Sequence, residues 1–439
     1  MSAPSDRSTL VPDFGPLAGV TVVDSARLVA GPWAATYLGE FGAQVIHVEG
    51  PPFGFPYADP SRSLPPILPE GAPPEVGVSE SWVQYSRNKL SLGLDLRSPE
   101  GRTVFLDLLR KADIWIESSR PGTYDRLGLS DAVVLEASPS LTVLHVSGYG
   151  QTGRADRISR PSYDLIGQAY SGSLSLQGRP DPDPPMRAGT ALNDTVTGLA
   201  GATAALMGYI SARRTGRGQV VDVAQYEVFF TLLENLALDY FTRGVVRGRF
   251  GTGHARLHPY DVFHAKDGWV VVAAPTPDSL RGLQKLLGVS DPRWLDWGWR
   301  TSHRDEVNGA IDAFCRLHTA EELEKVGQAN DVAISRVYSA REIAEDPHYQ
   351  ERRMFEEWED PVAGPVKGAG IAPKFSRTPG RVWRGAPWLG QDNDRVLGDL
   401  LGYSAERRAD LVKRGIVGEA RPTIDRSKYP PPKFRTGGP

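Results

Sequence analysis

The sequence predicts an α/β protein whose main sheet is parallel. Short segments that alternate or run in hydrophobic residues recur at residues 20–24, 44–49, 90–96, 113–117 and 141–147, with helical segments between them. Parallel strands need a crossover of a dozen or more residues, usually a helix, and this spacing provides one. The 439 residues are 40% hydrophobic and 23% charged, a composition typical of a globular protein with roughly two or three domains.

The first two βαβ units carry clear local signals. The strand at 20–24 is followed by a small-residue segment at 30–42, which predicts a tightly packed helix before the strand at 44–49. The next helix should begin at Ser98-Pro99, because serine is a favoured N-cap and proline is favoured at the first helical position. Residues 51–80 are rich in proline and lack periodicity, which predicts a long surface loop of the kind that borders active sites.

The second half of the chain has a different pattern of predicted helices and strands. An Ala- and Gly-rich segment at 199–213 predicts a buried helix, and a turn at 215–219, a strand at 220–223 and a helix at 226–240 follow. Between about 245 and 340 a hairpin strand at 269–274 accompanies several amphipathic helices. We therefore expect a second, smaller α+β domain there, and a final helical stretch at 394–413.

Charge and cysteine content exclude several classes of protein. A net charge of -3, from 50 basic and 53 acidic residues, provides no global field to attract nucleic acid or an anionic membrane. Cys315 is the single cysteine, which excludes an intramolecular disulfide and a thiolate metal cluster and fits a reducing compartment. Because the first residues lack a signal-peptide pattern and no run of about 18 apolar residues occurs, we expect a cytoplasmic protein without membrane or nucleic-acid partners.

A glycine motif follows the strand at 141–147. Residues 148–153 fit G-x-G-x-x-G, which is typical of dinucleotide binding when a helix opens at the motif. Here polar residues and Pro161 follow instead, so a loop that approaches some ligand is the better interpretation. A nicotinamide-dependent dehydrogenase is kept only as a remote alternative.

Motif searches predict neither a metal site nor a hydrolase. His254 and His258 have the i, i+4 spacing of a zinc site on a helix, but glycines and Pro259 around them argue against a helix. With His264 they are better interpreted as surface or substrate-lining histidines, and no metal is predicted. The serine-hydrolase, zinc-protease and P-loop motifs do not occur in the chain.

Asp194 is the candidate for covalent chemistry. It lies between Asn193 and Thr195 at the start of the small-residue helix, where an aspartate is most often an N-cap. The same place suits a nucleophile, since the positive end of the helix dipole should keep the carboxylate ionised at neutral pH. An ionised, partly desolvated carboxylate can attack a thioester carbonyl. Position alone leaves both interpretations open.

A series of short segments, taken together and in order, resembles the class III CoA-transferase family, which includes formyl-CoA and carnitine-type transferases. The similarity spans nearly the whole chain. Its segments are Pro16-Leu-Ala-Gly-Val-Thr-Val-Val-Asp24, Ala30-Gly-Pro32, residues 38–49, Asn88-Lys89, Leu94-Asp-Leu96, Ser98-Pro-Glu-Gly101, Arg120-Pro-Gly122, Asp125-Arg-Leu-Gly128, residues 147–153, Tyr163-Asp164, Gln168-Ala169, Ser171-Gly172, Asp194, Thr197-Gly198, Thr215-Gly-Arg-Gly-Gln219 with Asp222, Ala386-Pro387 and Leu389-Gly390.

The resemblance implies a fold and an assembly. It implies a Rossmann-like large domain built from both chain ends, a smaller domain between them and an interlocked homodimer. On this basis residues 1–225 are assigned to the N-terminal part of the CoA-binding large domain, 226–340 to the small domain with linkers, and 341–439 to the C-terminal return to the large domain. It also implies that Asp194 carries the acyl group, first as an anhydride and then as an aspartyl-CoA thioester, with no tightly bound cofactor.

The resemblance further implies where the substrates bind. The positions that match CoA-binding residues are Arg27, Leu28, Val29, Ala30, Ser118, Ser119, Arg126, Leu127 and Tyr149. Arg126 is the best candidate for a phosphate contact, because a guanidinium binds phosphate in a bidentate manner. The acid pocket is assigned to Tyr163, Gln168, Gly251 and Gly253, with residues 251–253 as the nearest counterpart of a glycine-rich lid.

The chain also departs from the family pattern. Gly50 and Ser147 stand where some members carry a basic residue, so the phosphate contacts are expected to move to Arg87 or Lys89. The loop at 51–80 is longer than in compact members and is expected to shape the acid pocket.

Alternatives remain for the activity and the acid. An α-methylacyl-CoA racemase of the same fold would use a histidine where Tyr163 stands, and a phenol is a poor base at neutral pH. A subunit of a heteromeric transferase is a further alternative. The expected acceptor is a mid-sized acid, a betaine or a dicarboxylate such as a substituted succinate, and the expected donor is succinyl-CoA or another acyl-CoA. The aromatic residues Trp33, Tyr37 and Tyr240 suit a bulky or aromatic acid.

Overall fold

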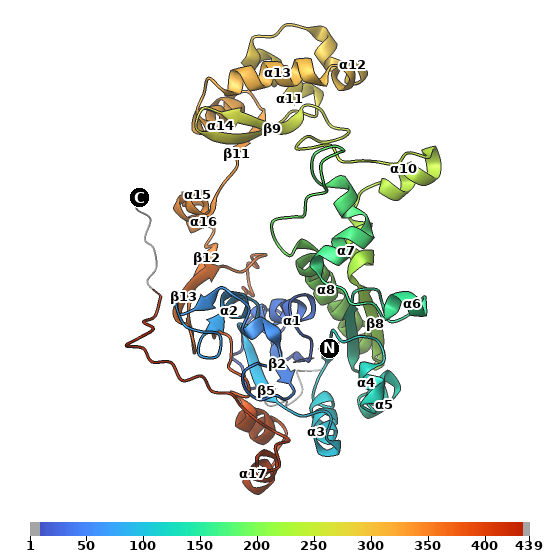
Figure 1. Cartoon of the computed structure of the whole chain (residues 1–439), viewed down its shortest axis with the longest axis vertical. Coiled ribbons are helices and arrows are strands. Elements are labelled where there is room, and N and C mark those ends of the chain that lie inside the picture. The colour runs from blue at the N-terminus through green and yellow to red at the C-terminus, as the bar shows by residue number, and fades with distance from the viewer. Residues whose placement is uncertain (1–8, 433–439) are drawn as a thin grey trace. The chain divides into compact units, whose positions relative to one another are not determined.

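The structure is a computed structural model that describes residues 9–432. It divides into two compact units, each described here by itself (Figure 1). Unit 1 comprises the chain up to residue 171, residues 189–234 and the chain from 348 onward. Unit 2 comprises residues 172–188 and 235–347. The sequence-based domain boundaries at 225 and 340 stay a prediction.

A six-stranded parallel sheet forms the centre of unit 1 and confirms the predicted mixed α/β fold. Its order is β5-β2-β1-β6-β7-β8, and every neighbouring pair is parallel. The strands are β1 (Thr21–Asp24), β2 (Gln44–Glu49), β5 (Lys89–Gly93), β6 (Ile114–Glu117), β7 (Thr142–Ser147) and β8 (Gln219–Ala224). In register, Val22 of β1 pairs with Val45 of β2 and Ile114 of β6. The predicted strands thus fall within one or a few residues of the observed ones.

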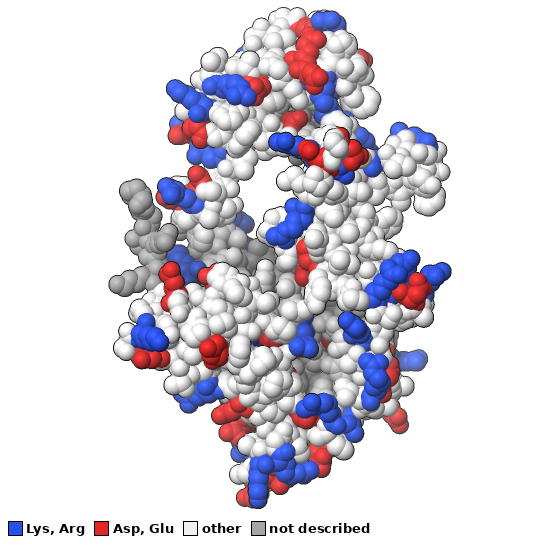
Figure 2. All heavy atoms as spheres, viewed as in Figure 1, with Lys and Arg blue, Asp and Glu red and all other residues white. Residues whose placement is uncertain are grey.

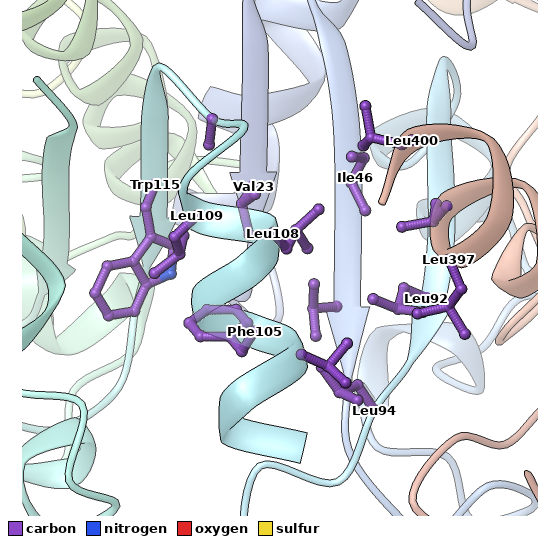
Figure 3. Close-up of a cluster of buried hydrophobic side chains, with 14 of the residues drawn as sticks. Val23, Ile46, Leu92, Leu94, Phe105, Leu108, Leu109, Trp115, Leu397 and Leu400 are labelled. Carbon is purple, nitrogen blue, oxygen red and sulfur yellow. The ribbon is translucent and has the colours of Figure 1, made fainter. Parts of the chain in front are cut away.

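Both faces of this sheet are covered, which explains its continuous hydrophobic strands. Neighbouring residues of one strand point to opposite faces, so Val22 and Val23 of β1 belong to different core clusters. On one face Val23, Leu92 and Trp115 pack with Phe105 of α3 (Pro99–Leu109) and with residues of the π-helix Arg395–Leu400, as Figure 3 shows. The opposite face packs against α1 (Ala30–Glu40) and α8 (Leu192–Thr215).

The remaining elements of unit 1 are short. Ser98 caps α3 as predicted, with its hydroxyl accepting a 2.9 Å hydrogen bond from the N–H of Gly101. The loop at 51–80 contains a 3₁₀ turn and a two-stranded pairing, so it is more ordered than predicted. The elements are η1 (Pro60–Arg62), β3 (Ile67–Leu68), β4 (Val78–Ser79), α2 (Glu80–Tyr85), α4 (Thr123–Arg126), α5 (Asp131–Ala137), α6 (Ala155–Ile158), α7 (Asp164–Ser171), α9 (Gln225–Thr231), α16 (Pro347–Glu351), β12 (Phe355–Asp360), β13 (Gly364–Ala369) and α17 (Ala405–Lys413).

Unit 2 has its own antiparallel sheet and core. The strand order is β11-β10-β9, and the predicted hairpin strand is β10, paired with β9. Cys315 lies buried in this core beside Leu323 and Trp294, away from solvent. The elements are η2 (Ser173–Leu176), α10 (Leu236–Arg243), β9 (Tyr260–Ala265), β10 (Gly268–Ala273), α11 (Pro277–Leu287), η3 (Pro292–Leu295), α12 (Trp297–Ser302), α13 (Arg304–Cys315), α14 (Ala320–Ala329), β11 (Ala333–Arg336) and α15 (Ala340–Glu345).

Three predicted helices differ from the observed ones. The segment 226–240 forms two helices, α9 and α10, because the chain breaks at 232–235, where Glu234 has a positive φ. The stretch 394–413 likewise divides into a π-helix and α17, separated by Gly402 in the left-handed region. Helix α8 is longer than predicted and spans 24 residues.

Helix α8 is buried on one face only. Its glycines permit close contact: a Cβ at Gly208 would lie 2.4 Å from Cγ2 of Thr142 in β7. On the other face Leu199, Met207 and Ile210 are 40%, 66% and 53% exposed. Among the described residues, α8 alone is long and apolar enough to cross a membrane by length and composition. Its glycine-lined contact with the sheet is typical of a core helix.

Candidate active site

A cleft lies at the switch point of the central sheet, where the side on which the chain adds successive strands reverses. From β1 the chain proceeds through β2 to β5 on one side, whereas β6, β7 and β8 extend the sheet on the other. Ligands of parallel α/β sheets bind outside the carboxyl ends of the strands at such a switch point. A hydrogen bond joins the segments that follow β1 and β6 there, because the N–H of Arg27 donates to Oγ of Ser118 at 2.9 Å.

The cleft collects residues from four strand ends and from α8. It is lined by Arg27, Leu28, Val29, Ala30, Gly31, Ser118, Val146, Ser147, Gly148, Ser162, Tyr163, Asp194 and Gln225. It therefore brings together Asp194, five of the positions predicted for CoA and Tyr163 of the predicted acid pocket.

Asp194 is not the N-cap of α8, so that interpretation is wrong. The N-cap is Ala191, and Asp194 is the third residue of the helix. The first turn is capped instead by Asp164, whose Oδ1 accepts hydrogen bonds from the N–H groups of Asn193 at 2.7 Å and Asp194 at 3.1 Å. Gln168 in turn donates to Oδ2 of Asp164 at 2.7 Å. The cap thus comes from α7 rather than from the helix itself.

This arrangement changes the charge state of Asp194. Burial and the neighbouring Asp164 carboxylate raise the pKa of Asp194 to about 7, although Gln225 donates a hydrogen bond to its Oδ1 and lowers it. The prediction that the helix dipole keeps this group fully ionised at neutral pH is therefore wrong, because desolvation and a like charge outweigh the dipole. An ionised Asp194 is correspondingly more basic and a stronger nucleophile than an exposed aspartate.

Two aromatic residues lie near Asp194. Burial and the charge of Asp194 raise the pKa of Tyr85, which places the phenol within electrostatic range of the carboxylate. The Tyr85 ring meets Trp33 edge to face with centroids 5.2 Å apart. Trp33 in turn packs over Gly198, one helical turn beyond Asp194, where a Cβ would come within 2.8 Å of the indole.

Four predicted CoA positions lie outside the cleft lining. The N–H of Ser119 donates to Glu117 at 2.6 Å, directly beyond the strand end. Arg126 is exposed on α4, where its guanidinium donates to Thr123 at 3.1 Å. Leu127 packs against the core cluster that contains Val23 and Phe105, and the ring of Tyr149 contacts the rings of Tyr170 and Tyr226. Their role in CoA binding stays a prediction.

The predicted acid-pocket residues have different environments. Tyr163 is 64% exposed at the cleft, whereas Gln168 is fully buried beneath it. Gly251 and Gly253 belong to unit 2, and their role as a lid stays a prediction.

Arg87 and Lys89 do not replace the missing basic residues, so that prediction is wrong. Both side chains are buried, at 1% and 0% exposure, because each is held by a carboxylate. Arg87 pairs with Glu40 and Lys89 with Asp24, at 2.5 and 2.9 Å. Buried cations committed in this way are not free to bind a phosphate.

The glycine motif and the histidines do not form separate sites, although Gly148 lines the cleft. The glycine segment 148–153 forms a loop, in which the N–H of Gln151 donates to Asp222 at 2.7 Å, and only the four-residue helix α6 follows it. His258 is buried in unit 2, so the surface interpretation is wrong for it. Within residues 9–432 no group of three or more His, Cys, Asp or Glu side chains could hold a metal ion. On the face shown in Figure 2, basic and acidic side chains are intermingled, which agrees with the small net charge.

Sequence reasoning missed Asp164 and Gln225 as hydrogen-bonding partners of the helix turn and side chain of Asp194. Gln225 directly follows the carboxyl end of β8, and ligand-contacting residues gather at such ends, so its position was a usable signal. Asp164 lies 30 residues from Asp194 in sequence, and no local pattern joins the two.

A parallel α/β sheet with a half-buried carboxylate in a cleft at its switch point is the arrangement of an enzyme active site. Comparison with known proteins identifies the family: residues 17–393 match the model of CoA-transferase family III, and the chain belongs to this family. It is thus an enzyme with CoA-transferase activity.

Individual relatives and solved structures are consistent with this family. The chain is 37% identical over 416 residues to the bile acid CoA-transferase BaiK of Clostridium scindens, covering 92% of this chain and 90% of the relative. It resembles the crystal structure of a CAIB/BAIF family protein from Brucella suis at 28% identity and a TM-score of 0.75, covering 88% of this chain and all of that one. Rv3272 from Mycobacterium tuberculosis is similar at 26% identity and a TM-score of 0.74, with 87% and 99% of the two chains covered.

Proposed function

We propose that this enzyme moves coenzyme A from an acyl-CoA donor to a carboxylic acid through covalent intermediates on Asp194. The observation that carries the proposal is the place of this carboxylate. It lies in the switch-point cleft together with Arg27, Leu28, Val29, Ala30 and Ser118, and it is surrounded so that its ionised form is basic.

The reaction proceeds in four balanced steps. The Asp194 carboxylate attacks the thioester carbonyl of the donor and expels CoA thiolate, which leaves a mixed anhydride. The thiolate then attacks the aspartyl carbonyl, releases the first acid and forms an aspartyl-CoA thioester. The acceptor carboxylate attacks this thioester and again expels thiolate, and the thiolate finally takes the acyl group from the second anhydride and restores Asp194. Each intermediate retains an activated acyl bond, so no ATP is consumed.

Two neighbours and partial burial support Asp194 in these steps. Asp164 occupies the first N–H groups of α8 and fixes the orientation of the helix turn that carries the nucleophile. The amide of Gln225 donates to Asp194 and steadies one of its oxygens, leaving the other to attack. Half-burial of the carboxylate limits hydrolysis of the anhydride, because fewer water molecules reach it.

The acceptor is a mid-sized or larger acid with an apolar body. The relative BaiK is named a bile acid CoA-transferase, and Trp33 and Tyr85 provide aromatic surface near Asp194 for the apolar body of such an acid. Succinyl-CoA or another acyl-CoA is the donor. A cytoplasmic location is part of the proposal.

The functional form is a homodimer. The proposal is supported by the exposed apolar side chains of Leu199, Met207 and Ile210 on α8, which a partner surface would remove from water. A second copy of the chain covers these side chains, in the interlocked arrangement that the family resemblance implies.

Intact-mass spectrometry with hydroxylamine trapping tests the proposal. Wild type incubated with a panel of acyl-CoA donors should give a hydroxylamine-sensitive adduct that maps to Asp194. The Asp194→Ala variant should give none, while Glu70→Gln, an exposed carboxylate of the 51–80 loop, should label like wild type. Exchange of the α-proton without any adduct would replace the transferase with the racemase of the same fold.

A further inference from the structure

The loop at 51–80 contacts the cleft edge through Ala58 and Asp59. The backbone N–H of Leu28 donates to the two carboxylate oxygens of Asp59 at 3.3 and 3.2 Å. The guanidinium of Arg27 donates to the carbonyl oxygen of Ala58. Because Arg27 and Leu28 both line the cleft, the loop holds the backbone and one side chain of its edge.

Leu28 has an unusual backbone conformation at this contact. Its φ is 67°, in the left-handed region that a residue with a branched side chain rarely adopts. Such a conformation persists only where the surroundings enforce it, and it is concentrated at ligand sites. Asp59 is the acceptor that captures the Leu28 N–H in this conformation.

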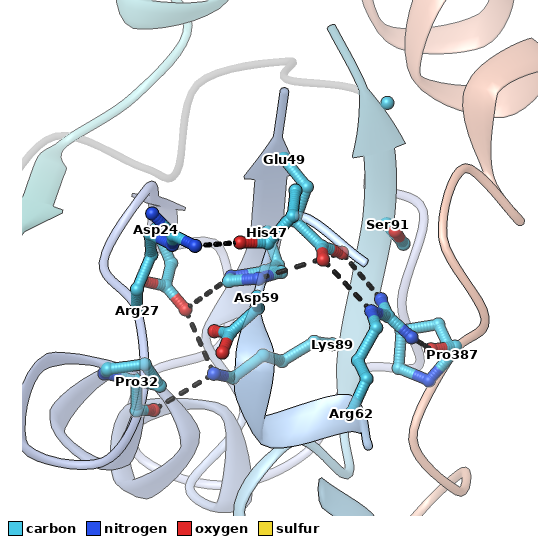
Figure 4. A network of polar contacts seen from close by, with 12 residues as sticks. Asp24, Arg27, Pro32, His47, Glu49, Asp59, Arg62, Lys89, Ser91 and Pro387 are labelled. Atoms are coloured by element: carbon cyan, nitrogen blue, oxygen red, sulfur yellow. Dashed lines mark hydrogen bonds and ion pairs between the residues drawn. The ribbon is translucent and has the colours of Figure 1, made fainter. Parts of the chain in front are cut away.

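Burial of the Asp59 carboxylate costs desolvation free energy. It is fully buried, and it lies in the cluster that Figure 4 shows. Its other hydrogen bonds come from the N–H and hydroxyl of Ser61 at 2.9 and 2.7 Å, while the nearby Arg62 pairs with Glu49 instead. Burial and the charge of Glu49 raise the pKa of Asp59, and His47 and Ser61 offset part of that effect. A buried carboxylate without a directly bonded cation needs a compensating role.

The same cluster fixes both ends of the turn between β1 and α1. Asp24 accepts a hydrogen bond from the N–H of Ala26 at 3.0 Å. Lys89 donates to Asp24 and to the carbonyl of Pro32, both at 2.9 Å (Figure 4). Although burial opposes the ionisation of Asp24, Lys89 and His47 outweigh it and lower the pKa to about 2. With positions 26 and 32 anchored, Leu28 is the point at which the turn still needs support.

We infer that Asp59 is a positioning residue for the coenzyme A site: it holds Leu28 in the left-handed conformation and thereby sets the edge formed by residues 27–30. This assigns the 51–80 loop a task in binding the CoA moiety. The inference rests on the proposed function, because it takes residues 27–30 as the CoA-binding edge.

Calorimetric titration of CoA into the whole protein tests the inference without requiring turnover. The Asp59→Ala variant should bind CoA about tenfold more weakly, which corresponds to ~1.4 kcal/mol, the scale of the left-handed penalty for one residue. The KM for acyl-CoA should rise in parallel, while the KM for the acceptor acid should not change. Asp59→Asn retains one acceptor oxygen and should lose less.

Ser61→Ala is the matched control. It removes a partner of Asp59 and loosens the same loop but leaves the contact with Leu28, so it should lower stability without changing the Kd for CoA. A double-mutant cycle with Leu28→Gly provides a second measurement, since glycine adopts positive φ without penalty. Removing Asp59 should then weaken CoA binding less in the Leu28→Gly background than in wild type.

The outcomes separate the two proposals. CoA binding by Asp59→Ala equal to that of wild type, or equal losses in Asp59→Ala and Ser61→Ala, would overturn the positioning role even if transfer is intact. Wild type that binds CoA but forms no adduct on Asp194 would overturn the transfer mechanism and leave the role of Asp59 measurable. Absence of CoA binding by wild type would overturn both.

Discussion

Replacing Asp194 by asparagine should make the protein more stable at neutral and alkaline pH while abolishing transfer. The carboxyl has a pKa of about 7 in the folded protein and an ordinary value of 3.8. Between these values the folded state binds more protons than the unfolded state, so the stability contributed by this group falls as pH rises from about 4 to 7 and is constant above. Asparagine has the same shape and no charge, so it escapes this loss.

The magnitude follows from the shift in pKa. At 1.36 kcal/mol for each pH unit, the cost of ionising Asp194 in the folded protein is at most about 4 kcal/mol. Solvent reaches part of the side chain and screens some of the cost, so we expect the variant to gain about 2–4 kcal/mol at pH 8 and clearly less at pH 5.

Urea denaturation followed by tryptophan fluorescence at pH 5 and pH 8 measures this difference. Because the chain has two units, the transition that reports unit 1 should be compared between variants. Glu70→Gln, which neutralises an exposed carboxylate, should show no comparable gain. An Asp194→Asn variant with equal or lower stability than wild type at pH 8 would refute the argument that burial and Asp164 disfavour the charged form of Asp194.

Three further predictions follow from the same structure. If Asp194 attacks in its ionised form, as proposed, kcat/KM for the acyl-CoA donor should rise with pH through about 7, and Gln225→Leu should move the inflection to higher pH because it removes the hydrogen bond that lowers the pKa; an unchanged profile would contradict this role of Gln225. Met207→Glu should shift the sedimentation coefficient from dimer toward monomer. Reversing the charge of the exposed Arg213 on the same helix, in Arg213→Glu, should not. Despite its burial, His145 has its pKa raised to about 10 by two carboxylates, so its contribution to stability is full below pH 6.5 and is lost as pH rises toward 10; in His145→Asn, stability measured between pH 7 and 10 should vary less with pH than in wild type.

Sequence patterns predicted the central sheet well because its signals are local. The strands at 44–49 and 113–117 differ by at most one residue from β2 and β6, and the Ser98 cap is observed as predicted. Hydrophobic runs, caps and crossover lengths depend on a few neighbouring residues, so one sequence suffices to find them. The segment 226–240 failed because a conformational break at Glu234 leaves little trace in hydrophobicity.

In the candidate site too, some features follow from the sequence and others only from the folded structure. The sequence by itself determined the family resemblance and singled out Asp194, since both depend on which residues occur and in what order. Only the tertiary structure decided that Asp164 caps α8 across 30 residues, that Arg87 and Lys89 are committed to buried ion pairs, and that Asp59 supports Leu28. The charge state of Asp194 also belongs to this second group. A pKa depends on burial and on charges brought close by folding, and a linear sequence specifies neither.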